Sequence, residues 1–228
     1  MQYDNIEYAE FISRPNRFVA EVLRNGQRER VHVPNTGRCR ELFQEGTEVV
    51  LSRSNNNKRK LPFSLISVYK GERLVNIDSQ NPNRLVREAL ESGRLLGFIP
   101  RKIRREYTFG SSRIDLMFED ERYGRGLIEV KGCTLEIEGR ALFPDAPTER
   151  GIRHLRELIA AAGQGWRSYV VFAVQMKGVH SFSPNAVTHP EFAETLREAA
   201  ASGVGVLAFD TLVKPAEVVL DKPVEVKL

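Results

Sequence analysis

The sequence has no long hydrophobic run, few cysteines and no start that resembles a leader. No stretch of about eighteen consecutive apolar residues occurs, so we expect no membrane-spanning helix and no membrane partner. The first residues, MQYDNIEYAEF, lack a basic stretch followed by an apolar one, and we expect no signal peptide. Two cysteines, Cys39 and Cys133, are too few for a disulfide framework, which favours a reducing, cytoplasmic location.

Internal repeats and low-complexity tracts are also absent, and the composition is that of a globular protein. Hydrophobic residues make up 41% and charged residues 28% of the 228 residues, a length sufficient for one large or two small domains. The pattern of apolar residues changes near Asn81 from strand-rich to mixed. We therefore predict two domains, residues 1–80 and 81–228, with separate hydrophobic cores.

Positive charge is concentrated in the first half, although the net charge is only +4. Residues 1–80 carry a net charge of +3 and residues 81–113 of +5, whereas the remainder carries −4. Such a surface suits a polyanion, with a merely solubilising surface as the alternative. We expect DNA as the partner, bound with little sequence preference, and leave RNA binding and a homodimer open. The expected phosphate contacts are Lys58, Arg59, Lys60, Arg101, Lys102, Arg104, Arg105 and Arg113.

Residues 7–77 have the pattern of several short strands in close succession. Segments 18–23 and 30–33 flank Asn25-Gly26, a dipeptide typical of two-residue hairpin turns. Further strands are predicted at 48–52, 65–69 and 74–77. This spacing predicts a small barrel or sandwich, and we prefer an all-β OB-like barrel that binds nucleic acid. The polar loop 54–60 ends in three basic residues that can contact phosphates.

From residue 83 onward, helical and strand patterns alternate. Asn83 is a candidate N-cap of a helix that ends at Ser92-Gly93, and longer helices are predicted at about 149–162 and 190–201. Strands are predicted at about 105–110, 113–119, 126–131, 169–174 and 204–209. The order α-β-β-β-α-β-α-β predicts an α/β domain in which helices cover a mixed sheet.

Two neighbouring predicted strands carry charges among apolar residues. Because side chains alternate along a strand, Asp115 is expected on one face and Ile114 and Leu116 on the other. Glu129 and Lys131 share a face for the same reason. If the two strands pair as a hairpin, Asp115 and Glu129 lie side by side and repel each other unless a cation lies between them.

Such a pair of carboxylates favours a divalent metal site. Mg²⁺ and Mn²⁺ prefer oxygen ligands, and Mg²⁺ takes one or two carboxylates and keeps waters or phosphate oxygens. We predict Asp115 and Glu129 as ligands, the backbone carbonyl of Val130 as a third, and Lys131 beside a bound water or phosphate. The alternative is a solvated sheet face on which Glu129 and Lys131 are ordinary surface residues.

The motifs also resemble those of known proteins. The strand pair resembles the active-site signature of the PD-(D/E)XK nuclease superfamily, and the whole chain resembles the sugar fermentation stimulation protein family of DNA-binding proteins. The matching segments are RFVA at 17–20, PNTG at 34–37, RID at 113–115, IEVK at 128–131, FPDAPTERG at 143–151, HL at 154–155 and FSP at 182–184.

The resemblance implies an OB-like domain, a nuclease-like domain of the PD-(D/E)XK type, DNA binding, and a link to the regulation of sugar use, maltose in particular. Asp115 matches the metal-binding acid of the superfamily, Glu129 the second acid and Lys131 the catalytic lysine. Glu88 falls where some members carry a further acid, with a helix surface charge as the alternative. Ile114 replaces the proline of the general signature.

Two function classes follow. The first is a Mg²⁺-dependent nuclease with catalytic residues Asp115, Glu129 and Lys131; the second is a non-catalytic DNA-binding regulator that retains a nuclease-like fold. The complete set of three residues favours the first. Arg150 and His154 lie one helical turn apart in either case and can bind a phosphate together.

Overall fold

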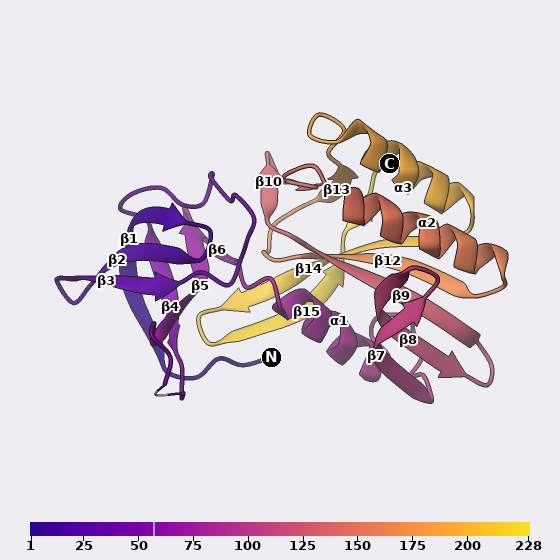
Figure 1. The fold of residues 1–228 in the computed structure, drawn as a ribbon, viewed down its shortest axis with the longest axis horizontal. Coiled ribbons are helices and arrows are strands. Elements are labelled where there is room, and N and C mark those ends of the chain that lie inside the picture. The colour runs from indigo at the N-terminus through magenta and orange to yellow at the C-terminus, as the bar shows by residue number, and fades with distance from the viewer. Residues whose placement is uncertain (57) are drawn as a thin grey trace.

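The computed structural model describes residues 1–56 and 58–228, so Asn57 of the polar loop lies outside the described residues. Its first part is a six-stranded antiparallel sheet with the order β3-β2-β1-β4-β5-β6 (Figure 1). A bridge between His32 and Ser64 joins β3 to β5 and closes a barrel, which confirms the predicted small barrel. The strands are β1 (Ile6–Asn16), β2 (Val19–Arg24), β3 (Gln27–His32), β4 (Glu48–Arg53), β5 (Phe63–Lys70) and β6 (Arg73–Asn76).

The hairpin between β2 and β3 shows how the local sequence sets the barrel. Asn25 and Gly26 both have positive φ, 51° and 77°, as a type I′ turn requires. The turn fixes the register that pairs Ala20 with Val31. Both side chains are fully buried inside the barrel, so the alternation of apolar and polar residues on these strands is satisfied.

The second part contains a six-stranded mixed sheet with the order β15-β14-β12-β9-β8-β7. Its central strands β9, β12 and β14 are parallel, whereas β7, β8 and β15 are antiparallel to their neighbours. The strands are β7 (Lys102–Phe109), β8 (Ser112–Asp120), β9 (Gly124–Cys133), β12 (Arg167–Val174), β14 (Gly205–Lys214) and β15 (Glu217–Pro223). A mixed sheet was predicted, and this part of the prediction is confirmed.

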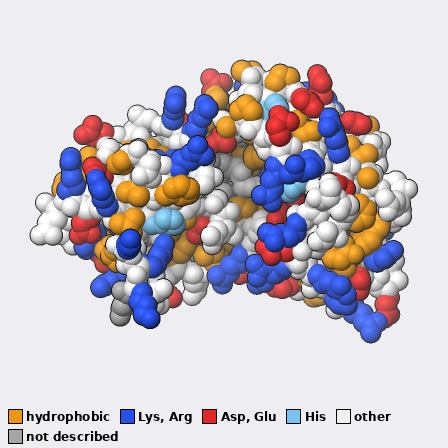
Figure 2. Space-filling model, viewed as in Figure 1, with side chains coloured by type: hydrophobic (Ala, Val, Ile, Leu, Met, Phe, Trp, Pro, Cys, Tyr) orange, Lys and Arg blue, Asp and Glu red, His pale blue; other side chains and the backbone are white. Residues whose placement is uncertain are grey.

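Helices cover both faces of this sheet (Figure 1). The helix α1 (Asn81–Glu91) packs on one face, while α2 (Glu149–Gly163) and α3 (Pro190–Ala201) lie on the other. None of the helices in the described ranges is long and apolar enough to cross a membrane. Figure 2 shows that the face in view is hollowed between the two lobes, with Lys and Arg side chains gathered on both sides of the hollow.

A second, small sheet of short strands was not predicted. It has the order β10-β11-β13-β16. Its strands are β10 (Leu135–Ile137), β11 (Arg140–Phe143), β13 (Ser181–Pro184) and β16 (Glu225–Val226). Segments of two to four residues carry too little alternation to be distinguished from loops, and their pairing depends on partners that are distant in sequence.

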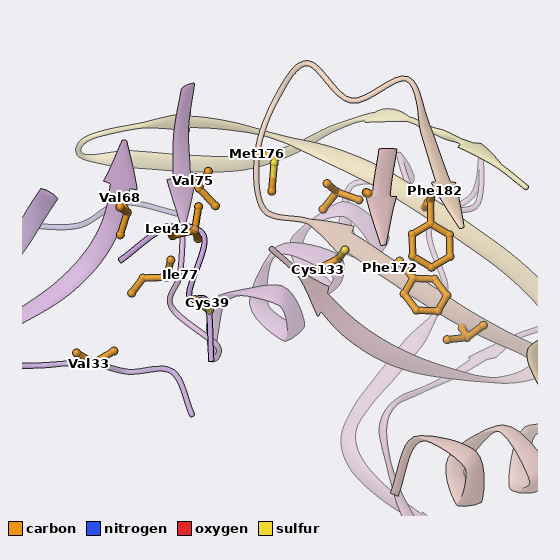
Figure 3. Packing of buried hydrophobic residues seen from close by; sticks show 14 of the residues in the cluster. Val33, Cys39, Leu42, Val68, Val75, Ile77, Cys133, Phe172, Met176 and Phe182 are labelled. Atoms are coloured by element: carbon orange, nitrogen blue, oxygen red, sulfur yellow. The ribbon is translucent and has the colours of Figure 1, made fainter. Parts of the chain in front are cut away.

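The expectation of two separate cores is wrong. One cluster of buried side chains continues from the barrel, through Leu42 and Ile77, to Cys133, Met176 and Phe172 of the second part (Figure 3). No sheet among the described strands combines strands of both parts. The parts therefore share apolar packing and one isolated antiparallel bridge, between Gln2 and Glu217, but no common sheet, and the division at residue 80 stays a prediction.

A buried ion cluster also joins the two parts. Glu136 on β10 is 7% exposed, and its Oε2 accepts a hydrogen bond from Lys70 Nζ at 2.6 Å and lies 3.0 Å from Arg73 NH1. The backbone N–H of Gly139 donates to Oε1 at 2.5 Å. Burial opposes ionisation, but the hydrogen bonds from Lys70 and Gly139 and the charge of Arg73 hold the pKa of Glu136 below the usual 4.5.

We expect Glu136→Gln to destabilise the protein by about 1–3 kcal/mol at neutral pH, because Lys70 and Arg73 lose a charged acceptor. A carboxylate with a lowered pKa stabilises the fold above its unfolded-state pKa, and this contribution is lost as the pH falls through the folded-state value. In urea unfolding, the difference from wild type should therefore shrink below about pH 4.5. Glu138→Gln, an exposed neighbour, is the control; a deficit that does not change with pH would contradict the prediction.

Candidate active site

Asp115 on β8 and Glu129 on β9 lie where the pairing of these strands ends. The last recorded pair is Leu116 with Ile128, and Asp115 and Glu129 are the next residues on the two strands. The Asp115 Oδ2 atom accepts a hydrogen bond from the backbone N–H of Val130 at 2.8 Å. The side chain of Asp115 therefore bonds to the β9 backbone just beyond the ladder.

The predicted alternation along β8 fails at Asp115. Leu116 is part of the buried cluster under α1, whereas Ile114 belongs to the cluster under α2, together with Met117. Two residues of a regular strand that are two positions apart would share a face. The break coincides with the hydrogen bond from Val130 N–H to Asp115 and with an irregularity on β7, where Glu106 has a positive φ of 53° and the recorded register passes from Arg105–Leu116 to Tyr107–Ile114. On β9 the alternation holds: Leu127 belongs to the α2 side, and Ile128 and Val130 to the α1 side.

Glu129 is almost fully buried, with 2% of its surface exposed. Its Oε1 accepts hydrogen bonds from Lys131 Nζ at 2.6 Å and from Nδ1 of His154 on α2. The other oxygen, Oε2, is buried and has no hydrogen-bond partner among the described residues. A buried carboxylate oxygen without a partner is unfavourable, and it can be satisfied by a cation.

His154 connects Glu129 to Arg150. Its Nε2 accepts a hydrogen bond from Arg150 Nε at 3.3 Å, so the hydrogen-bond pattern assigns the proton to Nδ1, which donates to Glu129. His154 is only 3% exposed. The expectation that Arg150 and His154 bind a phosphate together is therefore corrected for the histidine, which faces Glu129, whereas Arg150 is exposed.

The two acids are perturbed in opposite directions. Burial and the negative charge of Glu129 raise the pKa of Asp115, and the hydrogen bonds from Val130 and Asn83 only partly oppose this. Burial also acts on Glu129, but His154 and Lys131 outweigh it and lower the pKa of Glu129. One acid thus readily carries a negative charge, while the second resists ionisation beside it, which is the electrostatic situation that a bound cation relieves.

The residues fit a small oxygen-ligated divalent cation. Asp115 and Glu129 would supply carboxylates, and Val130, between Glu129 and Lys131, would supply a backbone carbonyl oxygen. Within residues 1–56 and 58–228, no group of three or more His, Cys, Asp or Glu side chains is arranged to hold a metal. A site with two carboxylates would therefore depend on water and phosphate oxygens for its other ligands, as Mg²⁺ sites commonly do.

Helix α1 contributes a different residue from the one expected. Glu88 forms ion pairs with the amino group of Met1 at 3.1 Å and with Arg84 at 3.0 Å. The expectation that Glu88 is a metal ligand is therefore corrected. Asn83 instead donates from Nδ2 to Asp115 Oδ1 at 2.7 Å. Asn83 is also not the helix cap, because α1 begins at Asn81 and Gln80 is the N-cap.

The predicted phosphate contacts are spread over the molecule. Arg105 lines a cavity of about 290 Å³ beside Asp115, together with Arg84 and Arg87 of α1. Arg113 lies 3.7 Å from Glu106. Of the others, Arg101 and Lys102 pair with Glu121 and Glu119, Arg104 is exposed on β7, and Lys58, Arg59 and Lys60 are exposed in the barrel loop.

A barrel followed by an α/β domain with two acids and a lysine on adjacent strands defines a two-part class of protein. The chain belongs to the sugar fermentation stimulation protein family. The family models described as "SfsA N-terminal OB domain" and "Sugar fermentation stimulation protein RE domain" match residues 12–77 and 80–217.

The chain aligns with its relatives over its full length. The chain is 46% identical over 228 residues to a sugar fermentation stimulation protein homolog of Ruminiclostridium cellulolyticum, with 100% of both chains covered. A homolog of Desulfitobacterium hafniense is 48% identical, with 100% of this chain and 99% of the other covered. The structure of Pyrococcus furiosus SfsA in complex with Ca²⁺ is similar to this one with a TM-score of 0.88 and 28% sequence identity. The match covers 100% of this chain and 98% of the other. The predicted family and fold class are confirmed.

We expect Asp115→Asn to lower the affinity for Mn²⁺ by about tenfold or more, because one of two carboxylate ligands loses its charge. The fold should persist, since the Asn83 amide can turn to accept a hydrogen bond from the new amide. Isothermal titration calorimetry measures the affinity, with Glu119→Gln on the same strand as a control of equal charge. Equal Mn²⁺ affinity in wild type and Asp115→Asn would show that the metal does not bind here.

Proposed function

We propose that the protein is a divalent-metal-dependent nuclease that hydrolyses phosphodiester bonds of DNA at Asp115, Glu129 and Lys131. The observation that carries this proposal is the buried Glu129 carboxylate, whose Oε1 is held by two donors while Oε2 has no partner among the described residues. Mg²⁺ or Mn²⁺ is the expected ion. The Ca²⁺ complex of Pyrococcus furiosus SfsA, a relative over its whole length, supports divalent-cation binding.

The metal, when bound, would polarise a phosphate oxygen and activate the attacking water. The side chains of Asp115 and Glu129 and the carbonyl of Val130 would hold it. Asn83 keeps Asp115 oriented through the 2.7 Å hydrogen bond, so the ligand does not have to be ordered during the reaction.

Lys131 is proposed to take part in the reaction directly. Its side chain is 13% exposed, and its ammonium lies 2.6 Å from Glu129 Oε1. An ammonium fixed beside the acids can bind a phosphate oxygen of the substrate or orient the attacking water, and it stabilises the negative charge that develops on phosphorus oxygens. Arg105, in the cavity beside Asp115, is placed to bind a neighbouring phosphate.

A non-catalytic DNA-binding regulator is the second candidate. The observation in its favour is the same ion pair: Lys131 already neutralises part of the Glu129 charge. A preserved ion pair can serve structure alone, because fold does not prove chemistry. In this case DNA would be bound through phosphates with little sequence preference, and the link to sugar use, maltose in particular, would act through binding. RNA binding and a homodimer stay predictions.

Incubation of the purified protein with single- and double-stranded DNA and RNA distinguishes the two candidates. We expect cleavage of a DNA substrate with Mg²⁺ or Mn²⁺ and none with EDTA. A protein that binds both metal and DNA but cuts no member of a broad panel would refute the nuclease and leave the regulator.

A further inference from the structure

A cationic groove lies on the barrel, outside the candidate active site. It has a volume of about 790 Å³ and opens between the end of β1, the loop 34–45 and Ala146 of the second part. Four arginines and one glutamate line it, and we call it the arginine groove. Its charged lining residues are Arg14, Arg17, Arg38, Arg40 and Glu45.

Arg14 builds the wall of the groove. Its guanidinium donates to the backbone carbonyls of Asn35 at 2.6 Å, Gly37 at 2.8 Å and Arg38 at 3.1 Å, and also to that of Arg17 at 2.8 Å. These bonds hold the loop in one conformation. The guanidinium of Arg14 is thus taken up by backbone hydrogen bonds. The positive charges available to a ligand are those of the other three arginines.

Those three arginines are not neutralised by the protein. Arg17, Arg38 and Arg40 are exposed, and no ion pair is recorded for any of them among the residues that the structure covers. Two exposed arginines of β3 differ from them, since Arg28 and Arg30 both pair with Glu21, whereas Arg53 and Arg59 of the same barrel likewise have no recorded ion pair among the described residues. Unmatched cations that converge on one groove indicate an anionic ligand.

The loop that lines the groove contacts the chain a few residues beyond the candidate active site. Cys39 Sγ, in the loop that carries Arg38 and Arg40, lies 3.8 Å from Thr134 Oγ1, three residues beyond Lys131 on the chain. Three residues of extended chain span roughly 10 Å, so the loop is within reach of a strand that leaves Lys131. Asn35 of the same loop also donates to the carbonyl of Ile77, four residues before α1.

The aromatic residues at the groove favour a single strand over a duplex. Phe43 lines the groove with the Arg14 guanidinium 4.8 Å from its ring centre, and Phe18, which follows Arg17 but is not itself a lining residue, has 56% of its surface exposed. Unpaired bases can stack on such rings, whereas the bases of a duplex are already stacked on one another. A cationic groove next to an exposed aromatic ring is an arrangement by which OB-type barrels bind single strands.

We propose that the arginine groove binds the phosphate backbone of a single DNA strand that extends from the site of Asp115, Glu129 and Lys131. The inference rests on the proposed nucleic-acid function and deepens it, because it assigns a single-stranded segment to the substrate. Arg38 and Arg40 contact phosphates, and Phe18 stacks on a base.

The test measures binding in EDTA, so that nothing is cleaved. The probes are a fluorescein-labelled oligothymidylate of about 20 nucleotides, longer than a typical OB site, and a duplex of equal length. We expect Arg38→Ala/Arg40→Ala to weaken oligothymidylate binding about tenfold or more and to reduce the salt slope by about 1.4, which corresponds to two single-strand phosphate contacts. Phe18→Ala should weaken it about tenfold without changing the slope.

Arg28→Ala/Arg30→Ala removes the same charge from the same barrel and is the matched control. The inference is overturned if the two double variants lose equal affinity, or if duplex binding falls as much as oligothymidylate binding. Thermal melts establish that the variants are folded. Metal-dependent cleavage by wild type is measured separately. Cleavage without an effect of the groove variants would support the nuclease and refute the single-strand site. An effect of the groove variants without cleavage would support the single-strand site and refute the nuclease.

Discussion

Lys131→Ala is expected to reduce metal-dependent DNA cleavage by roughly a thousandfold while leaving Mn²⁺ binding largely intact. The reason is its location: the ammonium lies beside Glu129 and contributes no metal ligand. Its loss removes a positive charge from the place where negative charge develops during hydrolysis. Single-turnover cleavage gives the rate of the chemical step, and calorimetry on the same samples gives the metal affinity.

The matched control is Arg153→Ala, an exposed cation on α2 that makes no recorded ion pair within the described residues. It should cleave at close to the wild-type rate. Cleavage by Lys131→Ala within about tenfold of wild type would refute a direct role for the ammonium. Loss of Mn²⁺ affinity in Lys131→Ala would instead show that the lysine acts by positioning Glu129.

The acids and the lysine could be predicted because their signal is local. Charges among apolar residues on two strands that are adjacent in sequence are enough to place Asp115 and Glu129 at one end of a hairpin, although the expected alternation of side chains fails at Asp115. The contact between His154 and Glu129 could not be predicted, because 25 residues separate them and the contact depends on how α2 packs on the sheet. The spacing of Arg150 and His154 showed only that they share a helix face.

Other predictions from the sequence were wrong for the same reason, because they depend on tertiary contacts. Asn83 has the residue type of a helix cap, yet its amide is used by Asp115, and the helix begins two residues earlier. Glu88 has the right residue type and element for a metal ligand, but its contacts to Met1 and Arg84 take it elsewhere. Separate cores were expected from a change of pattern, which cannot reveal that the two parts pack together.

His154→Ala is expected to weaken Mn²⁺ binding by about 10- to 100-fold, although the histidine is not proposed as a metal ligand. In the structure, its Nδ1–H and Lys131 together hold Oε1 of Glu129, which leaves Oε2 free for a cation. Without the imidazole, the Glu129 carboxylate can rotate. Metal binding must then also fix its orientation, which lowers the affinity for Mn²⁺. Calorimetry on folded samples measures the loss, which does not depend on any cleavage assay.

His154→Asn separates the hydrogen bond from the volume of the ring. Its amide nitrogen can occupy nearly the position of Nδ1 and donate to Glu129, so we expect Mn²⁺ affinity within a few fold of wild type. A purely structural histidine would give similar metal affinities for both variants after correction for stability, since each leaves a cavity in α2 packing. Wild-type affinity in a folded His154→Ala protein would show that Lys131 alone orients Glu129, and that the buried Glu129–His154 contact serves the packing of α2 on the sheet.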